Sequence, residues 1–373
     1  MLYEFHIIKN YPPTNLNRDD TGSPKSCLFG GVQRGRISSQ CLKRSWRQSD
    51  IFNSFINEIG IRTRKLPELI VNELRSKGVA EEFMQIALQK VTGFGNDKGT
   101  ENKDGRTSQI MFFSQQDIIA VADRVHEAIN EAGTVKDFEK INAKEIQKKM
   151  KDVSIRPITI DIALFGRMVT SEAFADVEAS MQVAHAISTH AISQESDFYT
   201  AVDDLVKGDS EDDTGAGMMG DIDYNSSCYY IYAALDTDQL RINLEHSPEA
   251  LKLTGKIVQC LLETMAYSNP SGKQNSFAGH VLPDVVYVEK KHKKIPVSYA
   301  NAFVKPAYQT RDKDLVQVSE DKLAREIDNL SKKFELDIDK KLWFCTSDDV
   351  KQPDNSIKVA SFKNLLDYFS DEI

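Results

Sequence analysis

The sequence has no run of 18 or more apolar residues, so it contains no simple membrane-spanning helix. Its five cysteines are odd in number and widely separated, and none forms a CxxC pair, which argues against a disulfide framework and a zinc site. Cysteine usage of this kind is typical of a reducing compartment, and we expect a cytoplasmic protein. The first residues, MLYEFHIIKNYPP, have an early acid and no basic leader, so they favour a first strand over a signal peptide.

Motifs of the common enzyme classes are also missing. The seven histidines include no HExxH, and the chain has no Walker loop, no GxSxG and no GxGxxG. Aspartate pairs are able in principle to hold Mg²⁺ for a nuclease, but they lie in turn-rich segments where aspartate is expected for backbone reasons. We therefore expect no catalytic residue, no metal and no cofactor. The pairs are Asp19 with Asp20, Asp203 with Asp204, Asp212 with Asp213, and Asp221 with Asp223.

Enough apolar sequence is present for a sizeable core. With 373 residues, 40% of them hydrophobic, the chain has room for two to three domains or for one large fold with insertions. Segments with an apolar period of two predict strands, and segments with a helical apolar period predict helices. The expected strands are Leu2–Ile8, Ile155–Leu164, Met181–Ile187, Cys228–Leu235, Val281–Glu289 and Ile295–Ala302. The expected helices are one from about Gln40, then Pro67–Lys77, Glu81–Val91, Gln115–Ala132, Asp137–Met150, Thr237–Leu244, Pro248–Thr264, Glu320–Phe334 and Ser361–Phe369.

Two segments interrupt this mixture of strands and helices. Residues 51–150 contain mainly helical patterns around the glycine-rich, charged stretch Gly93–Gly105, and predict a helical insertion. Gln194–Asn225 has no core-forming period and holds four glycines, which predicts a long loop or hairpin that projects from the body. We therefore expect an α+β fold that is interrupted twice.

The opening part of the chain is basic although the whole chain is acidic. Lys9–Arg47 holds eight basic and two acidic residues, a local balance of +6 against -9 for the chain. Arg34 and Arg36 point the same way in an extended strand, and Lys43 shares a helical stripe with Arg47. Glycines allow a ligand to approach the backbone, and a helix start offers N–H groups to phosphate. These features predict a surface that follows the phosphates of an extended polyanion; the alternative is a solvated basic helix.

Two further loops carry suitable side chains. Asn269–Phe277 combines a glycine with Lys273 and Gln274, although short loops of this composition are common. After the expected strand that ends at Leu164, Met168 at a loop apex is able to wedge against bases, although a methionine there is more often part of a core. Nothing in the sequence indicates base-specific readout, because it has neither a recognition-helix signature nor an RNP aromatic motif.

Five segments that span most of the chain carry a family resemblance. They are NLNRDDTG at Asn15–Gly22, FGGVQRGRISSQCLKRSWR at Phe29–Arg47, IDIALFGRMVTS at Ile160–Ser171, AHAISTHAISQESDFYTAVDDL at Ala184–Leu205 and SYANAFVKP at Ser298–Pro306. In these segments the sequence resembles the Cas-seven family, the backbone subunits of the type I-E CRISPR surveillance complex called Cascade.

The resemblance implies a fold and a set of RNA contacts. The fold would be an RRM-like (ferredoxin-like) palm of residues 1–55, 155–193 and 226–373, helical fingers of residues 56–154, and a protruding thumb of residues 194–225. The implied role is non-catalytic: several copies line up head to tail along one CRISPR RNA, bind its phosphates, kink it periodically and support pairing with target DNA. By matching position, the expected RNA contacts are Arg18, Lys25, Ser38, Gln40, Lys43, Arg44, Arg47, Arg167, Met168, Thr200, Lys273 and Gln274.

The implied partners are the CRISPR RNA (crRNA), target DNA through the guide hybrid, other copies of the chain, and the remaining Cascade subunits: large, small, 5′-end capping and crRNA-processing endonuclease. No membrane partner is expected. The thumb departs from the family pattern because it is longer and more acidic, which leaves residue roles within Lys207–Asp223 open.

Two other functions stay open at this point. One is a metal-dependent nuclease that cuts a guide-paired strand with Asp19, Asp20 or thumb carboxylates, as a loop aspartate does in type III relatives. The other is an α+β interaction protein whose basic face contacts acidic partners.

Overall fold

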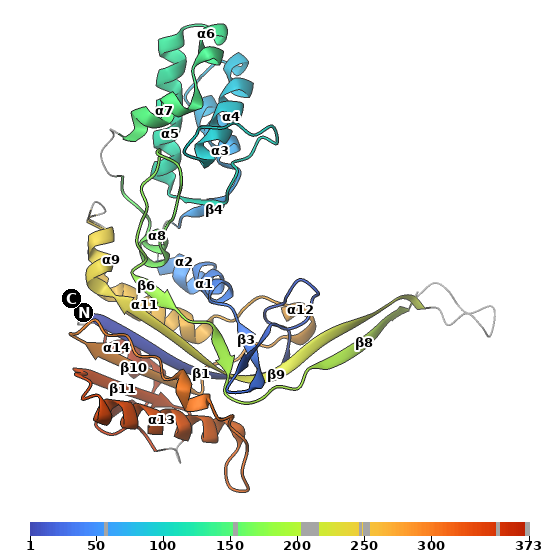
Figure 1. The fold of residues 1–373 in the computed structure, drawn as a ribbon, viewed down its shortest axis with the longest axis vertical. Coiled ribbons are helices and arrows are strands. Elements are labelled where there is room, and N and C mark those ends of the chain that lie inside the picture. Colours follow the sequence, from blue (N-terminus) through green and yellow to red (C-terminus); the bar gives the residue numbers. More distant parts are fainter. Residues whose placement is uncertain are drawn as a thin grey trace, which may run out of the picture. The chain divides into compact units, whose positions relative to one another are not determined.

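The computed structural model describes residues 1–55, 59–151, 156–202, 216–245, 248, 254–347 and 351–369. Its internal contacts divide the chain into two compact units. The sheet unit comprises Met1–Phe52, Val183–Leu235 and Gly255–Ile373, and the helical unit comprises Asn53–Gln182 and Asp236–Thr254. One unit is built on a large sheet and the other on packed helices, which confirms the expected α+β class (Figure 1).

One large β-sheet organises the sheet unit. Its strand order is β12–β11–β10–β1–β9–β7–β3–β2, so the first strand lies inside the sheet beside strands from later parts of the chain. β10 pairs antiparallel with β1 on one side and with β11 on the other, whereas β12 runs parallel to β11. The bounds are β1 Leu2–Thr14, β2 Ser26–Phe29, β3 Val32–Ile37, β7 Ala186–Ser188, β9 Ala216–Asp236, β10 Val285–Lys291, β11 Lys340–Cys345 and β12 Ile357–Lys358.

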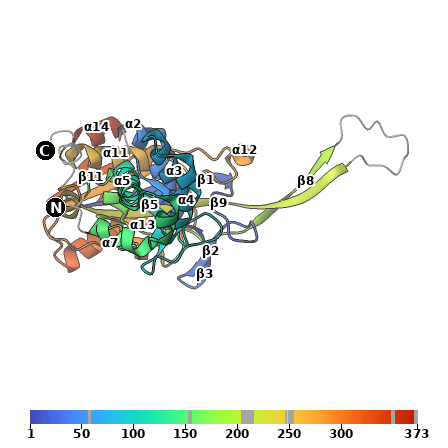
Figure 2. The same ribbon diagram turned by 90° about the horizontal axis from the view of Figure 1, so that it is seen from above.

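Strand β1 is buried on both faces. Tyr3, Phe5 and Ile7 share one face, as predicted, and the ring of Tyr3 lies 5.9 Å from that of Phe369 at the C-terminal end. The opposite face belongs to a core that includes residues of α13. Helices therefore cover the sheet on both sides (Figure 2). They are α11 Thr254–Tyr267, α13 Leu315–Lys333 and α14 Phe362–Asp367.

Buried polar groups on β1 hold an irregular segment against the sheet. Glu4 is fully buried, and its Oε1 accepts hydrogen bonds from Tyr232 Oη at 2.5 Å and from Val297 N at 2.6 Å. The strand predicted at 295–302 is wrong, because Val297 N donates to the Glu4 side chain and Tyr299 N donates to Tyr230 Oη at 3.0 Å in place of strand pairing. The segment ends instead in the 3₁₀-helix η3, Ala300–Phe303.

A long two-stranded hairpin projects from the sheet unit (Figure 1). Strand β8, Glu195–Val202, pairs antiparallel with the first half of β9, while the second half of β9 contains the predicted strand at 228–235. The expected projecting segment is thus a hairpin, and its tip at residues 203–215 lies outside the described residues.

The helical unit has its own core, in which helices pack their apolar faces together. Helix α5 matches its predicted bounds, because both of its ends carry local signals. Ser114 and Asp117 form a capping box at the start, and Gly133 takes the left-handed conformation (φ 67°) just after the end. The bounds are β4 Ile61–Thr63, α3 Leu66–Ser76, η1 Glu81–Phe83, α4 Met84–Thr92, η2 Gly93–Gly95, β5 Met111–Phe113, α5 Gln115–Ala132, α6 Val135–Lys140 and α7 Ala143–Lys151.

The strand predicted at 155–164 is wrong. Helix α8, Ile160–Phe165, occupies the second half of this stretch, and its residues from Ile160 to Leu164 are all buried. When every side of a short element is buried, an apolar period of two no longer distinguishes strand from helix. Asp161 stabilises the helix start, because its Oδ1 accepts hydrogen bonds from Thr159 Oγ1 at 2.6 Å and from Gly60 N at 3.0 Å.

Smaller differences concern element breaks. The strand predicted at 181–187 is two short strands, and the helix predicted at 137–150 is the pair α6 and α7. Part of the helix predicted at 248–264 falls outside the described residues, and α11 begins at Thr254. No helix in the described part of the chain has the length and apolar character needed to cross a bilayer. The remaining bounds are α1 Ser39–Arg47, α2 Asp50–Phe55, β6 Met181–Val183, α9 Thr237–Asn243 and α12 Gln274–Phe277.

Candidate nucleic-acid interface

Three segments, one of them distant from the other two in the sequence, meet at one end of β1. Residues 15–25, here called the front turn, follow β1 directly, and residues 269–279, the back loop, pack on the same end. Gly279 shows how close the approach is, because a Cβ in its place would lie 2.1 Å from a methyl carbon of Thr14. The third segment is the start of helix α1.

A side-chain hydrogen bond and a close backbone approach join these segments. Asn17 in the front turn accepts a hydrogen bond from Ser38 N through Oδ1 at 2.9 Å, and its carbonyl accepts one from Lys25 N at 2.8 Å. Gly272 lies so close to the turn that a Cβ there would be 2.3 Å from Leu16 O. The structure therefore brings the back loop to the same end of the sheet unit as the front turn and α1, which both belong to the basic stretch Lys9–Arg47.

Helix α1 displays polar side chains because its apolar ones point inward. Ser38 caps it by accepting a hydrogen bond from Cys41 N at 3.3 Å. Leu42 and Trp46, which are four residues apart and so share one face of the helix, are both 2% exposed. The predicted contact residues of α1 lie on its remaining surface: Gln40 and Arg44 are exposed, and Lys43 and Arg47 are half-buried.

Positive charge gathers between β3 and α1. Arg36 Nη1 lies 3.0 Å from His185 Nδ1, and burial followed by the charges of Arg36 and Lys25 lowers the pKa of His185. Burial raises the pKa of the Cys41 thiol, whereas Lys25 and Arg44 act to lower it. Lys25 thus acts electrostatically on His185, next to Arg36, and on Cys41 in α1. A positive potential of this kind attracts phosphate.

Arg34 does not belong to this surface, although the sequence pattern places it beside Arg36. Its side chain is fully buried, and it donates hydrogen bonds to Phe303 O at 2.7 Å and to Ser188 O at 3.1 Å. Burial lowers the pKa of its guanidinium. The interpretation that both arginines follow phosphates is therefore wrong for Arg34, which ties β3 to β7 and η3.

The back loop offers Lys273 and Gln274 next to the front turn. Lys273 has a φ of 49°, in the left-handed region that costs a non-glycine residue of order 1 kcal/mol. Gln274 Nε2 donates to Pro270 O at 2.8 Å, and Tyr11 Oη at the end of β1 donates to Asn269 Oδ1 at 2.7 Å. These bonds fix the loop in a defined conformation.

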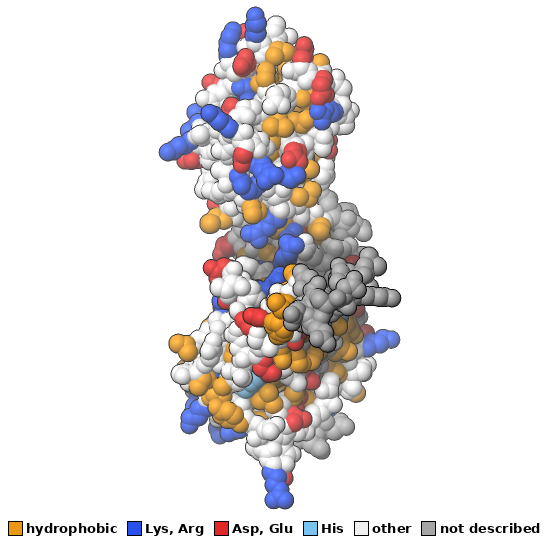
Figure 3. Space-filling model, turned by 90° about the vertical axis from the view of Figure 1, so that its right-hand side faces the viewer, with side chains coloured by type: hydrophobic (Ala, Val, Ile, Leu, Met, Phe, Trp, Pro, Cys, Tyr) orange, Lys and Arg blue, Asp and Glu red, His pale blue; other side chains and the backbone are white. Residues whose placement is uncertain are grey.

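The hairpin carries Thr200 together with exposed apolar side chains. Thr200 pairs with Met219 across the hairpin, and Phe198 is two residues away on the same face. Phe198 and Met219 are each 64% exposed. Figure 3, which views the molecule from the hairpin side, shows hydrophobic side chains at the surface of the sheet unit. Exposed apolar groups of this kind are typical of surfaces that contact another molecule.

Comparison with known proteins identifies the family. A sequence model of the CT1975-like protein family matches residues 3–370. The chain belongs to this family. This confirms, at the level of the family, the resemblance to the Cas-seven proteins. No curated protein sequence matches the chain.

Solved structures of similar chains come from CRISPR complexes. One, described as a "CRISPR RNA-guided surveillance complex, pre-nicking", contains a chain with 26% identity and a TM-score of 0.81, and the match covers 99% of this chain and 98% of that one. Another, a "CRISPR RNA-guided surveillance complex", contains a chain with 22% identity and a TM-score of 0.72, with the same coverage of 99% and 98%. The second match shows similarity of fold alone.

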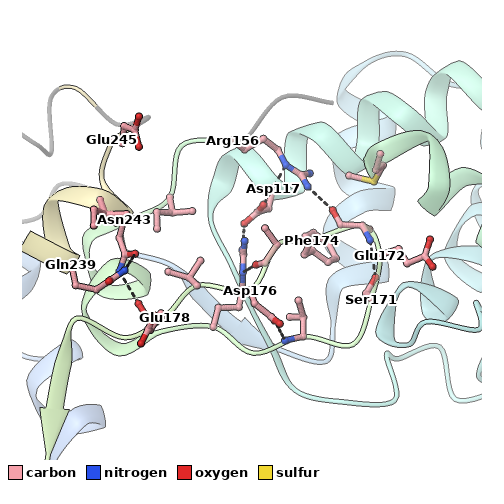
Figure 4. Close-up of a pocket in the computed structure, with 18 residues that line it drawn as sticks. Asp117, Arg156, Ser171, Glu172, Phe174, Asp176, Glu178, Gln239, Asn243 and Glu245 are labelled. Carbon is pink, nitrogen blue, oxygen red and sulfur yellow. Dashed lines mark hydrogen bonds and ion pairs between the residues drawn. The ribbon is translucent and has the colours of Figure 1, made fainter. Parts of the chain in front are cut away.

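In the helical unit of this CT1975-like protein, Arg167 and Met168 are adjacent but face different surroundings. Arg167 is buried, and its Nη1 lies 2.6 Å from Asp117 Oδ2. Asp117 also lies 3.7 Å from Arg156 Nε (Figure 4). Met168 is 91% exposed. The buried Arg167 therefore stabilises the loop that follows α8 through its contact with Asp117. The exposed side chain of Met168 is the one that a ligand can reach.

Of the carboxylates considered for a nuclease, Asp19 behaves as a turn residue, whereas Asp221 and Asp223, which were expected in a turn-rich segment, lie in strand β9. Asp19 Oδ1 accepts hydrogen bonds from Thr21 Oγ1 at 2.7 Å, Thr21 N at 2.9 Å and Ser23 N at 3.0 Å, and the Thr21 hydroxyl bond is the main cause that lowers the pKa of Asp19. Among the described residues, no group of three or more His, Cys, Asp or Glu side chains is placed to hold a metal ion. The thumb acids at 203–213 lie outside the described residues.

A second basic cluster was not predicted from the sequence. Lys322 Nζ on α13 donates to Lys305 O at 3.1 Å, and burial followed by the charges of Arg325 and Lys305 lowers the pKa of Lys322. Tyr308, 62% exposed, lies in the loop between them. The sequence held no signal for this cluster, because only the packing of α13 brings the residues together.

Proposed function

We propose that this CT1975-like chain is a non-catalytic backbone subunit of a type I-E CRISPR surveillance complex. Several copies line up head to tail along one crRNA and bind its phosphates without regard to sequence. They kink the guide periodically and support its pairing with target DNA in antiviral defence. Base pairing by the guide, and not the protein, then reads the target sequence.

The convergence of three segments on one end of the sheet unit supports this proposal most directly. The front turn, α1 and the back loop carry nine of the twelve predicted contact residues, and eight of these are at least partly exposed. The ninth, Ser38, is 6% exposed and caps α1 by accepting a hydrogen bond from Cys41 N, and phosphate is proposed to approach the remaining N–H groups of the helix start. A basic surface built on backbone-anchored loops suits a phosphate chain that passes across it.

In this proposal, the sheet unit corresponds to the palm, the helical unit to the fingers and the β8–β9 hairpin to the thumb. Thr200 on the hairpin and Met168 in the helical unit are proposed to contact the guide where it is kinked. Because Arg167 is buried against Asp117, we propose that it stabilises the loop that carries Met168 and does not contact RNA directly. The proposed partners are crRNA, target DNA, further copies of this chain and the other Cascade subunits.

Binding of a labelled single-stranded RNA, measured over a range of salt concentrations, tests this function. The double variant Lys43→Ala/Arg47→Ala should bind about tenfold more weakly, and its log–log salt slope should be lower by about 1.4, since each contact to a single strand contributes about 0.7. The matched control is Lys332→Ala/Lys333→Ala at the end of α13, which removes the same charge elsewhere on the sheet unit. An unchanged slope in the first variant would refute this RNA path.

The nuclease alternative is tested on the purified complex of this chain with its guide RNA. With Mg²⁺ and a labelled strand complementary to the guide, the proposal expects the strand to remain intact. Periodic cuts that disappear in the Asp19→Ala variant would overturn the non-catalytic role.

A further inference from the structure

The root of the β8–β9 hairpin is attached to the front turn by side chains. Asp223 on β9 lies opposite Ser196 in the last pairs of the hairpin, next to the body of the sheet unit. Its Oδ2 accepts hydrogen bonds from Ser23 Oγ at 2.6 Å and from Gln194 Nε2 at 2.7 Å. One carboxylate oxygen therefore joins the front turn, the chain entering β8 and strand β9.

A buried asparagine reinforces this attachment. Asn15 is fully buried, and its Nδ2 donates to Asp223 O at 2.7 Å and to Gly22 O at 3.0 Å. The same amide group thus closes the front turn and grips the hairpin backbone. Because a buried amide that lost these partners would be left unsatisfied, the turn and the hairpin root are held together strongly.

The front turn is attached on its other sides as well. Asn17 links it to the start of α1, and Gly272 in the back loop packs against its backbone. The ring of Tyr224, the residue after Asp223, lies 5.7 Å from that of Phe277 in the back loop. A shift of the front turn therefore cannot occur without strain at the hairpin root.

We infer that Asp223, Ser23 and Asn15 are positioning residues that couple RNA binding at the front turn to the orientation of the hairpin. This inference rests on the proposed function, because Arg18 and Lys25 of the turn are proposed phosphate contacts. Phosphates bound there hold the turn in place, and the bonds to Asp223 then hold the hairpin root. Through this coupling the guide would set the direction in which the hairpin, with Thr200, projects.

Hydrogen exchange measured by mass spectrometry on the full chain, with and without a saturating single-stranded RNA, tests the coupling. In Asp223→Ala, amides of the hairpin root at 195–200 and 220–224 should exchange about tenfold faster than in the wild type, because Ser23 and Gln194 lose their acceptor. RNA should slow this exchange in the wild type and fail to do so in Asp223→Ala. Asp223→Asn, which retains an acceptor oxygen, should restore the wild-type response.

Asp221→Ala is the matched control. Asp221 is on the same face of the same strand, is exposed, and lies opposite Phe198 and not next to the front turn. Its variant should behave like the wild type. Equal exchange in Asp223→Ala and Asp221→Ala would overturn the inference, and so would full protection of the Asp223→Ala root by saturating RNA. Absence of RNA binding by the wild type would refute the proposed function instead, while faster exchange in RNA-free Asp223→Ala would still establish the attachment.

Discussion

Glu320 on α13 is a buried acid whose surroundings disfavour its charge. It is fully buried, Cys345 Sγ lies 3.3 Å from its Oε1, and its Oε2 has no hydrogen-bond partner among the described residues. Burial, with smaller contributions from neighbouring aspartates, raises the pKa of Glu320 to about 7. Because this pKa is above the unfolded value, the associated stability is fully present below pH 4.5 and is lost as pH rises through about 7.

Glu320→Gln should therefore change how stability depends on pH. The amide resembles the protonated acid, so at pH 8 the variant should be more stable than the wild type by roughly 1–3 kcal/mol, and near pH 4.5 the difference should vanish. Urea unfolding at several pH values measures this. A constant difference across the range would show that Glu320 is not the titrating group.

Arg34→Met tests the structural role of the buried guanidinium. The variant leaves the carbonyls of Phe303 and Ser188 without their donor inside the sheet unit, so the free energy of unfolding should fall by roughly 2–4 kcal/mol. Arg18→Met removes the same group from an exposed site and should change stability by less than about 0.5 kcal/mol. If denaturant unfolding showed the same loss of stability in both variants, the structural role of Arg34 would be contradicted.

Helix α1 combines a structural cap with a proposed phosphate contact in Ser38. Ser38→Ala should lower the free energy of unfolding by about 1 kcal/mol, because the Cys41 N–H loses its acceptor. Ser38→Asp keeps the cap, but its charge repels phosphate. We expect it to retain wild-type stability and to bind single-stranded RNA about tenfold more weakly. If the aspartate variant bound RNA like the wild type, the phosphates would not pass the start of α1.

Elements with local end signals were predicted well from the sequence. Helix α5 has its capping box at Ser114 and its glycine at Gly133, and α1 has Ser38 and the pair of Leu42 and Trp46. Elements whose conformation depends on distant parts of the chain were not predicted correctly. The residues of α8 are buried on all sides, and the segment before η3 is held by side chains on distant strands, so no local pattern identifies either.

The candidate site likewise has features that were predictable from the sequence and features that were not. The basic character of the front turn and α1 is visible in the sequence, because their charges are close together along the chain. The burial of Arg34 was not predictable, because its carbonyl partners come from β7 and η3. Nor was the link from Asn15 and Ser23 to Asp223, which joins residues about two hundred positions apart.

At the scale of the whole molecule, the arrangement of charge matters more than its sum. The formal net charge of the chain is -9, yet the stretch Lys9–Arg47 has a net charge of +6. A uniformly basic subunit would repel its own copies and bind nucleic acid indiscriminately. Confining positive charge to limited surfaces suits a protein that is proposed to stack on copies of itself while it holds one RNA.

The nucleic acid that co-purifies with this chain tests the central proposal most directly. The complex would be isolated from its own cells through a tag on this subunit, and the extracted nucleic acid would be separated on a denaturing gel after treatment with RNase or DNase. We predict RNA of one discrete length, strongly reduced when the subunit carries Lys43→Ala/Arg47→Ala. Absence of RNA, or RNA of random lengths, would contradict the proposed role as a guide-bound backbone subunit.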